Sequence, residues 1–173
     1  LNNVLLSAVA FTVLLGTFYP LVIDMIGGDK ISVGPPYYAL TFVPIATPLL
    51  LVMALGPALK WKRDDLRAAF SRLKLAAIGG VVGAIVIMGL TFGHNILTAF
   101  FMAVALWIIV GSMLLLAQRV RLGFAPFSTS LKLIGTTPRA FYGLVIAHAG
   151  IGILVAGIAG MSTWATEKID LMQ

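Results

Sequence analysis

The 173-residue sequence contains no cysteine and very few charged residues. The absence of cysteine excludes disulfide bonds, thiolate metal sites and cysteine nucleophiles. Charged residues make up 10% of the chain, whereas hydrophobic residues make up 60% and the mean hydropathy is +1.05. An ordinary soluble domain carries about 25% charged residues, and so few charges could not cover the large water-facing surface of a small protein. The composition therefore excludes a soluble domain and predicts an integral membrane protein.

Five stretches are long and apolar enough to cross a bilayer. A membrane-spanning segment needs about 20 mostly apolar residues, and it must be helical because lipid offers no partner for a free backbone amide. The five stretches contain no Asp, Glu, Lys or Arg and cover residues 4–23, 38–59, 75–92, 96–117 and 140–161. The predicted fold class is all-α: a polytopic membrane helix bundle of five transmembrane helices. We expect residues 1–173 to form a single membrane domain that is part of a larger bundle, as a fragment or subunit of a longer chain.

Two local patterns add detail to these helices. Pro44 and Pro48 lie one turn apart in the second stretch, which predicts a bend there. The third and fourth stretches are separated only by Gly93-His94-Asn95, so we expect them to form a tight helical hairpin.

The basic residues divide unevenly between the two sides of the membrane. If the helices alternate in direction, ten of the twelve Lys and Arg residues lie on the side of the N-terminus, and only Lys30 and Lys168 lie on the other. Such an excess marks cytoplasmic loops. We predict a multi-pass protein of the bacterial inner membrane with the N-terminus and the basic loops 60–74 and 118–139 in the cytoplasm. Loop 24–37 and the C-terminal tail are then periplasmic, and the basic charge indicates orientation and not a nucleic-acid partner.

The first basic loop has an amphipathic pattern. Trp61, Leu66, Phe70 and Leu73 fall at roughly helical spacing between basic residues, which predicts a short helix in the cytoplasmic headgroup layer. The second loop is similar but more broken, and Pro138 marks the start of the last transmembrane helix.

His148 is the most informative polar residue of the membrane region. It lies eight residues into the fifth stretch, about 12 Å from the cytoplasmic end at 1.5 Å per residue. An ionisable residue at such a depth is costly unless it is paired, and it indicates function. A neutral imidazole there can bond a neighbouring helix, relay a proton, or coordinate a metal such as haem iron.

Small residues follow His148 at four-residue steps, at Gly152, Ala156 and Gly160. This flat stripe lets either another helix or a flat macrocycle approach closely. His94 cannot share a haem with His148, because His94 lies in the outer turn and His148 is about 18–20 Å from the outer end of its helix. The two axial nitrogens of one iron are only about 4 Å apart. If His148 binds haem, the second ligand lies outside this segment.

Several segments resemble the CcmF family of cytochrome c maturation proteins. They cover most of the chain in order: Leu1-Asn2-Asn3, Leu15-Gly16-Thr17-Phe18-Tyr19-Pro20-Leu21, Lys30-Ile31-Ser32-Val33-Gly34-Pro35-Pro36-Tyr37-Tyr38, Leu55-Gly56-Pro57, Trp61-Lys62-Arg63-Asp64 and Gly143 to Ala159. The most specific parts are the Ile-Ser-Val-Gly-Pro-Pro segment and the Ala-His pair of the last helix.

The resemblance implies a part of an inner-membrane haem lyase. CcmF-type proteins take haem from a periplasmic carrier protein and attach it covalently to apocytochrome c, and they hold a b-type haem within the membrane. One axial histidine of that haem lies in the late helix, and His148 stands at the matching position. The resemblance thus implies haem b as cofactor, His148 as axial ligand of its iron, and Gly152 and Ala156 on a face that the haem approaches. No catalytic residue is assigned.

The sequence also departs from the family pattern. The tryptophan-rich, histidine-flanked segment that presents haem is absent, because Trp61, Trp107 and Trp164 are isolated. We therefore expect a missing N-terminal half or a companion subunit to supply that segment, and we expect this piece alone to be inactive. Two other classes remain open: a part of a secondary transporter, or a cofactor-free scaffold for assembly factors. The role of the Gly34-Pro35-Pro36 loop is unassigned.

Overall fold

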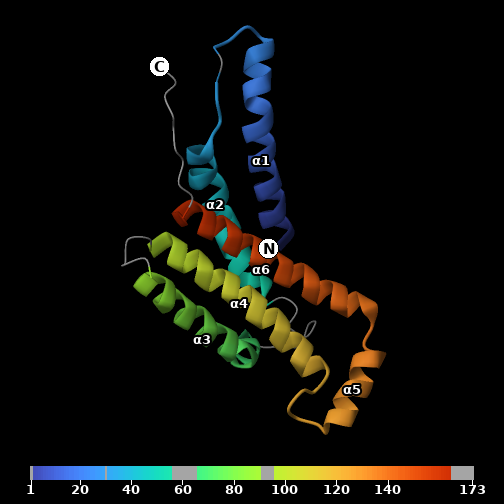
Figure 1. Ribbon diagram of the computed structural model, residues 1–173. Coiled ribbons are helices and arrows are strands. Elements are labelled where there is room, and N and C mark those ends of the chain that lie inside the picture. The colour runs from blue at the N-terminus through green and yellow to red at the C-terminus, as the bar shows by residue number, and fades with distance from the viewer. Residues whose placement is uncertain (1, 30, 56–65, 91–95, 165–173) are drawn as a thin grey trace, which may run out of the picture. The chain divides into compact units, whose positions relative to one another are not determined.

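The computed structural model of the chain describes residues 2–29, 31–55, 66–90 and 96–164. In this part of the chain every regular element is an α-helix: α1 (Asn2–Met25), α2 (Pro35–Met53), α3 (Leu66–Leu90), α4 (Ile96–Arg119), α5 (Phe127–Thr136) and α6 (Arg139–Trp164) (Figure 1). All of them except α5 are long and apolar enough to cross a membrane. The predicted all-α fold class and the five transmembrane helices are therefore confirmed.

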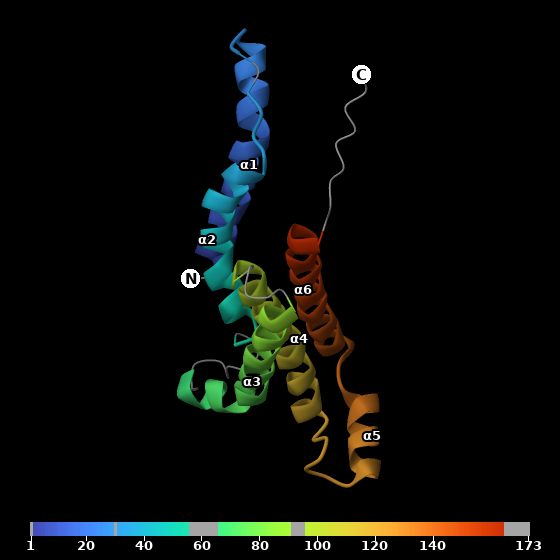
Figure 2. The same cartoon turned by 60° about the vertical axis from the view of Figure 1, so that its left-hand side comes forward.

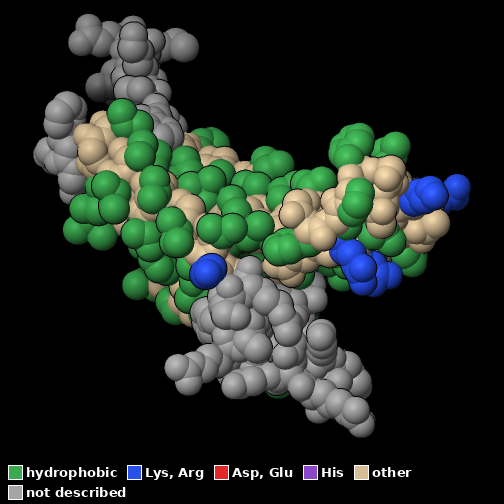
Figure 3. Space-filling model, turned by 90° about the horizontal axis from the view of Figure 1, so that it is seen from below, with side chains coloured by type: hydrophobic (Ala, Val, Ile, Leu, Met, Phe, Trp, Pro, Cys, Tyr) green, Lys and Arg blue, Asp and Glu red, His purple; other side chains and the backbone are tan. Residues whose placement is uncertain are grey.

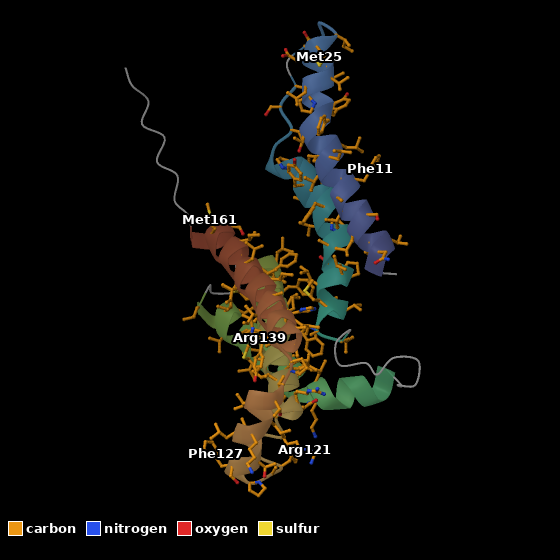
Figure 4. All side chains as sticks on the ribbon, turned by 90° about the vertical axis from the view of Figure 1, so that its right-hand side faces the viewer. Phe11, Met25, Arg121, Phe127, Arg139 and Met161 are labelled. Atoms are coloured by element: carbon orange, nitrogen blue, oxygen red, sulfur yellow. The ribbon has the colours of Figure 1, made fainter. Side chains whose placement is uncertain are left out.

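Three features differ from the predicted boundaries. Helix α2 ends at Met53, before the Gly56-Pro57 pair, because a residue that precedes proline is disfavoured in the helical conformation. Helix α3 begins at Leu66, so residues 66–74 of the predicted headgroup-layer helix are continuous with the third transmembrane helix. Its first turns nevertheless run across the direction of the rest of α3 (Figures 2 and 4). Helix α5 forms within the loop that was predicted to be broken.

Some predictions are not tested by the described helices. The hairpin turn with His94 and the residues around Trp61 lie outside the described part of the chain. Helix α2 continues through both Pro44 and Pro48, and the bend at these residues stays a prediction.

The chain divides into two compact units, Leu1–Val52 and Met53–Gln173, each of which is described by itself. The single membrane domain expected for residues 1–173 stays a prediction. In the first unit, the Tyr37 hydroxyl of α2 donates a hydrogen bond of 3.0 Å to the Thr12 carbonyl oxygen of α1. Gly16 makes room for this contact, since a Cβ atom there would lie 2.7 Å from the Tyr37 ring and 2.8 Å from the Tyr38 hydroxyl.

Helix α1 ends in a glycine cap. Gly27 has a positive φ of 77°, and the Gly28 amide donates to the Ile23 carbonyl oxygen at 3.0 Å. This backbone pattern satisfies carbonyl groups that the helix end leaves open, and it requires a residue at ease in the left-handed region.

In the second unit, α4 packs between α3 and α6, and α3 and α4 lie side by side (Figure 1). Glycines permit the close approach: a Cβ atom at Gly80 of α3 would lie 3.0 Å from the Ala103 carbonyl oxygen of α4, and one at Gly83 would clash with Leu106. Helix α4 is accordingly the most buried of the transmembrane helices. The predicted pairing of the third and fourth helices is present in this packing.

The outer faces of these helices are apolar. Large side chains such as Val81, Ile85 and Ile146 are more than half exposed. A surface of this kind suits lipid, in which apolar side chains carry no cost. The described part of the chain is therefore a multi-pass membrane protein by both its composition and its surface.

Candidate functional site

His148 lies on the flank of the packed face of α6. Its neighbours Val145 and Ala149 are buried, and His148 itself is half-buried. It follows Arg139, the first residue of α6, by nine positions, or about 14 Å along the helix axis. Figure 4 labels Arg139 and Met161 near the two ends of this helix. The depth of the imidazole within the hydrocarbon stays a prediction from this position along the helix.

A backbone hydrogen bond determines which ring nitrogen of His148 carries the proton. The Nδ1 atom lies 2.8 Å from the Leu144 carbonyl oxygen one turn earlier. A carbonyl oxygen can only accept, so Nδ1 is the donor and carries hydrogen. In the neutral imidazole, Nε2 then keeps a free lone pair, which is the form that binds a metal.

The Nε2 atom is not sealed inside this chain. Over the described residues, no buried side-chain nitrogen or oxygen lacks a hydrogen-bond partner. The hydrogen bond found for His148 in the same residues uses Nδ1. Nε2 therefore keeps some exposed surface within the described residues.

The close approach expected at Gly152 is present, and α4 makes it. A Cβ atom at Gly152 would lie 2.6 Å from the Ile109 side chain and 3.0 Å from the Ala105 carbonyl oxygen. Of the two partners that the small stripe allowed, a helix and a macrocycle, the helix occupies the space at Gly152. Ala156 is half-buried on the same side of α6, and its assignment to a haem-facing surface stays a prediction.

The described part of the chain contains no complete metal-binding cluster. Those residues hold no group of three His, Cys, Asp or Glu side chains close enough to bind a metal ion. His94, which the sequence already separates from His148, falls outside them. The site supplies one imidazole nitrogen, and any further ligand to the same metal must come from other residues.

A second group of polar contacts joins the ends of α4, α5 and α6. The Arg119 guanidinium lies 5.6 Å from the centre of the Phe141 ring, and the Tyr142 hydroxyl donates to the Ile134 carbonyl oxygen at 2.8 Å. The sequence indicated a broken amphipathic segment in this loop but not the limits of α5, because Pro126, Gly135 and Pro138 punctuate the loop. The spacing of Phe127, Leu131 and Ile134 was the signal that could have predicted it.

The helices and the single deep histidine define a polytopic membrane protein with a candidate metal-ligating imidazole. Over its full 173 residues the chain is 38% identical to cytochrome c-type biogenesis protein CycK of Bradyrhizobium diazoefficiens, covering 26% of that protein. It is 36% identical over 172 residues to CycK of Rhizobium meliloti, covering 99% of the chain and 25% of that protein. It is 31% identical over 168 residues to CcmF of Escherichia coli, covering 96% of the chain and 24% of that protein.

The chain belongs to this CcmF and CycK family of cytochrome c-type biogenesis proteins, as the sequence motifs predicted. It spans about a quarter of the length of the relatives it matches. No protein-family model matches the chain. No solved structure matches it either.

Proposed function

We propose that this chain acts in cytochrome c biogenesis as a membrane-embedded part of a haem lyase. In this proposal, Nε2 of His148 is one axial ligand of a b-type haem held within the membrane. The observation that carries the proposal is the hydrogen bond from Nδ1 to the Leu144 carbonyl oxygen, which leaves the Nε2 lone pair of a neutral imidazole available to a metal. The membership in a family of cytochrome c-type biogenesis proteins supports the cofactor class.

The chain's own residues have defined tasks in this role. The Leu144 carbonyl oxygen fixes the orientation and tautomer of the imidazole, and this kind of support tunes a metal ligand. Gly152 sets the distance between α6 and α4, and thereby the position of the helix that carries His148. The haem, when bound, supplies one-electron redox chemistry.

Attachment of haem requires parts beyond this chain. The second axial ligand, the tryptophan-rich segment that presents haem, the haem carrier protein and apocytochrome c all fall to the rest of the protein or to companion subunits. The proposed location is the bacterial inner membrane, with the N-terminus and loops 60–74 and 118–139 in the cytoplasm. The ten basic residues on that side support this orientation.

Visible absorption spectroscopy of the complete lyase tests the assignment. We expect a His148→Gly variant to lose the low-spin spectrum of the membrane haem, and added imidazole to restore it by filling the space of the missing ring. The matched control is Ile151→Ala, three residues further along α6 and also half-buried, which we expect to keep the spectrum.

Two results would contradict the proposal. An unchanged low-spin spectrum in His148→Gly would place the ligand elsewhere and favour a cofactor-free role for this part of the lyase. Loss of the spectrum without rescue by imidazole, in a variant that inserts and folds like the control, would assign His148 to helix packing.

A further inference from the structure

The apolar face of α5 is uncovered within its unit. Phe127, Leu131 and Ile134 recur at helical spacing and are 76%, 59% and 44% exposed. Phe124, in the turn before α5, is 87% exposed. By helical geometry Lys132 lies on the opposite side of α5, so this helix is amphipathic with an apolar face that its own unit leaves open.

The position of α5 places this face at a membrane boundary. Helix α4 ends at Arg119 and α6 begins at Arg139, and both helices are long enough to span the bilayer. The hydrogen bond from the Tyr142 hydroxyl to the Ile134 carbonyl oxygen ties α5 to the first turns of α6. Figure 1 shows that α5 runs across the direction of α6. A helix so placed lies along the surface of the bilayer that α6 crosses.

The charge of the surrounding loop has one sign. Residues 118–139 include Arg119, Arg121, Lys132 and Arg139 but no Asp or Glu. Figure 3 shows Lys and Arg side chains beside hydrophobic ones on the same surface. Basic and exposed apolar groups together suit the boundary between anionic headgroups and acyl chains.

Arg121 adopts a backbone conformation that favours glycine. Its φ is 55°, and the Leu122 amide donates to the Ala117 carbonyl oxygen at 2.8 Å, which completes the cap of α4. The Arg121 carbonyl oxygen accepts from the buried Ser130 hydroxyl at 3.4 Å and so joins the cap to α5. A residue in the left-handed region commonly ends a helix in this way. The cap thereby positions the Arg121 backbone beside α5.

We propose that α5 and the turn before it, residues 120–136, bind the anionic phospholipid surface of the membrane. The side chains of Phe124, Phe127 and Leu131 enter the acyl boundary. Arg121 and Lys132 bind headgroup phosphate oxygens. This inference does not rest on haem binding, and it holds for either outcome of the haem experiment.

Site-directed spin labelling tests this docking directly, because the chain contains no cysteine to replace first. The full chain, with a single label at Leu131→Cys or at the exposed Thr129→Cys on the other side of α5, is reconstituted in phosphatidylcholine vesicles with and without phosphatidylglycerol. We expect the label at 131 to collide with membrane-soluble oxygen and the label at 129 with a water-soluble nickel chelate. Phosphatidylglycerol should increase this difference in accessibility between the two labels.

A matched pair of charge variants separates the headgroup contact from a general effect of charge. We expect Lys132→Gln to lower the ratio of embedded to free segment by about fivefold, since one basic residue near an anionic surface contributes roughly that factor. Lys74→Gln removes the same charge from an exposed position on α3. It should leave the membrane embedding of the label at 131 unchanged.

Three results would overturn the proposal. Equal exposure of both labels to the nickel chelate would mean that no membrane contacts this face. Protection of the label at 131 from both oxygen and the chelate would mean that a protein covers it. Equal embedding with and without phosphatidylglycerol, together with no effect of Lys132→Gln, would refute an anionic lipid as the partner.

Discussion

Nδ1 of His148 lies 2.8 Å from the carbonyl oxygen of Leu144, so a backbone group of the same helix sets the tautomer of this histidine. This relationship can be measured without haem. We expect ¹⁵N solid-state NMR of the chain in lipid to show a protonated Nδ1 and an unprotonated Nε2. A His94→Gln variant leaves a single histidine signal, and an Nε2–H tautomer there would contradict the structure.

The contact between α4 and α6 should depend on Gly152 and not on Gly150. In Gly152→Ala, the new Cβ atom meets Ile109 and the Ala105 carbonyl oxygen, so we expect a loss of about 1–3 kcal/mol, as for other overpacked interiors. Gly150→Ala has nothing within 4 Å of the new Cβ atom, and we expect it to be neutral or slightly stabilising. Thermal unfolding in detergent compares the two. Equal losses would mean that α6 packs on α4 through another face.

The pairing of α1 with α2 should depend on the Tyr37 hydroxyl. Tyr37→Phe removes its hydrogen bond to the Thr12 carbonyl oxygen, and we expect a loss of about 0.5–1.5 kcal/mol. Tyr19→Phe is the control, since that ring is 51% exposed on the same unit. The readout is the stability of the first unit in detergent. A change of equal size in both variants would contradict the assigned contact.

Arg121→Gly should stabilise the chain against unfolding. Glycine relieves the left-handed conformation of residue 121, which costs a side-chain-bearing residue roughly 1–2 kcal/mol. Arg119→Gly removes the same charge from the last turn of α4, where glycine is unfavourable, and we expect it to destabilise. If both variants lower the melting temperature, the strain at residue 121 is absent. If α5 binds anionic lipid as proposed, Arg121→Gly gains stability against unfolding but binds the membrane surface more weakly through α5.

The predicted orientation can be tested with single cysteines in the same cysteine-free background. We expect Ser128→Cys to react with a membrane-impermeant maleimide only when the reagent reaches the cytoplasmic side. Asp29→Cys, in the loop after α1, should react from the periplasmic side of intact cells. The reverse pattern would overturn the orientation drawn from the ten basic residues.

The sequence predicted the number and approximate limits of the transmembrane helices because hydropathy and length report directly on the ability to cross lipid. It also singled out His148, since an ionisable residue is rare at that depth. The start of α3 lies several residues before its predicted limit, because helical backbone can continue beyond the apolar stretch. The end of α2 lies several residues before its predicted limit, because apolar composition continues past the point where the helix ends, ahead of Gly56-Pro57. Loop 118–139 was read as broken because proline and glycine hid the short helix α5.

The sequence by itself determined the class of this protein: apolar composition requires a membrane, the motifs identify the CcmF and CycK family, and one histidine provides the candidate ligand. Only the tertiary structure decided which faces meet. Gly152 faces α4 and Gly150 does not, although both are glycines of the same apolar helix. The physical reason is that lipid and neighbouring helices are equally apolar, so hydrophobicity cannot distinguish them, and close steric fit makes the choice.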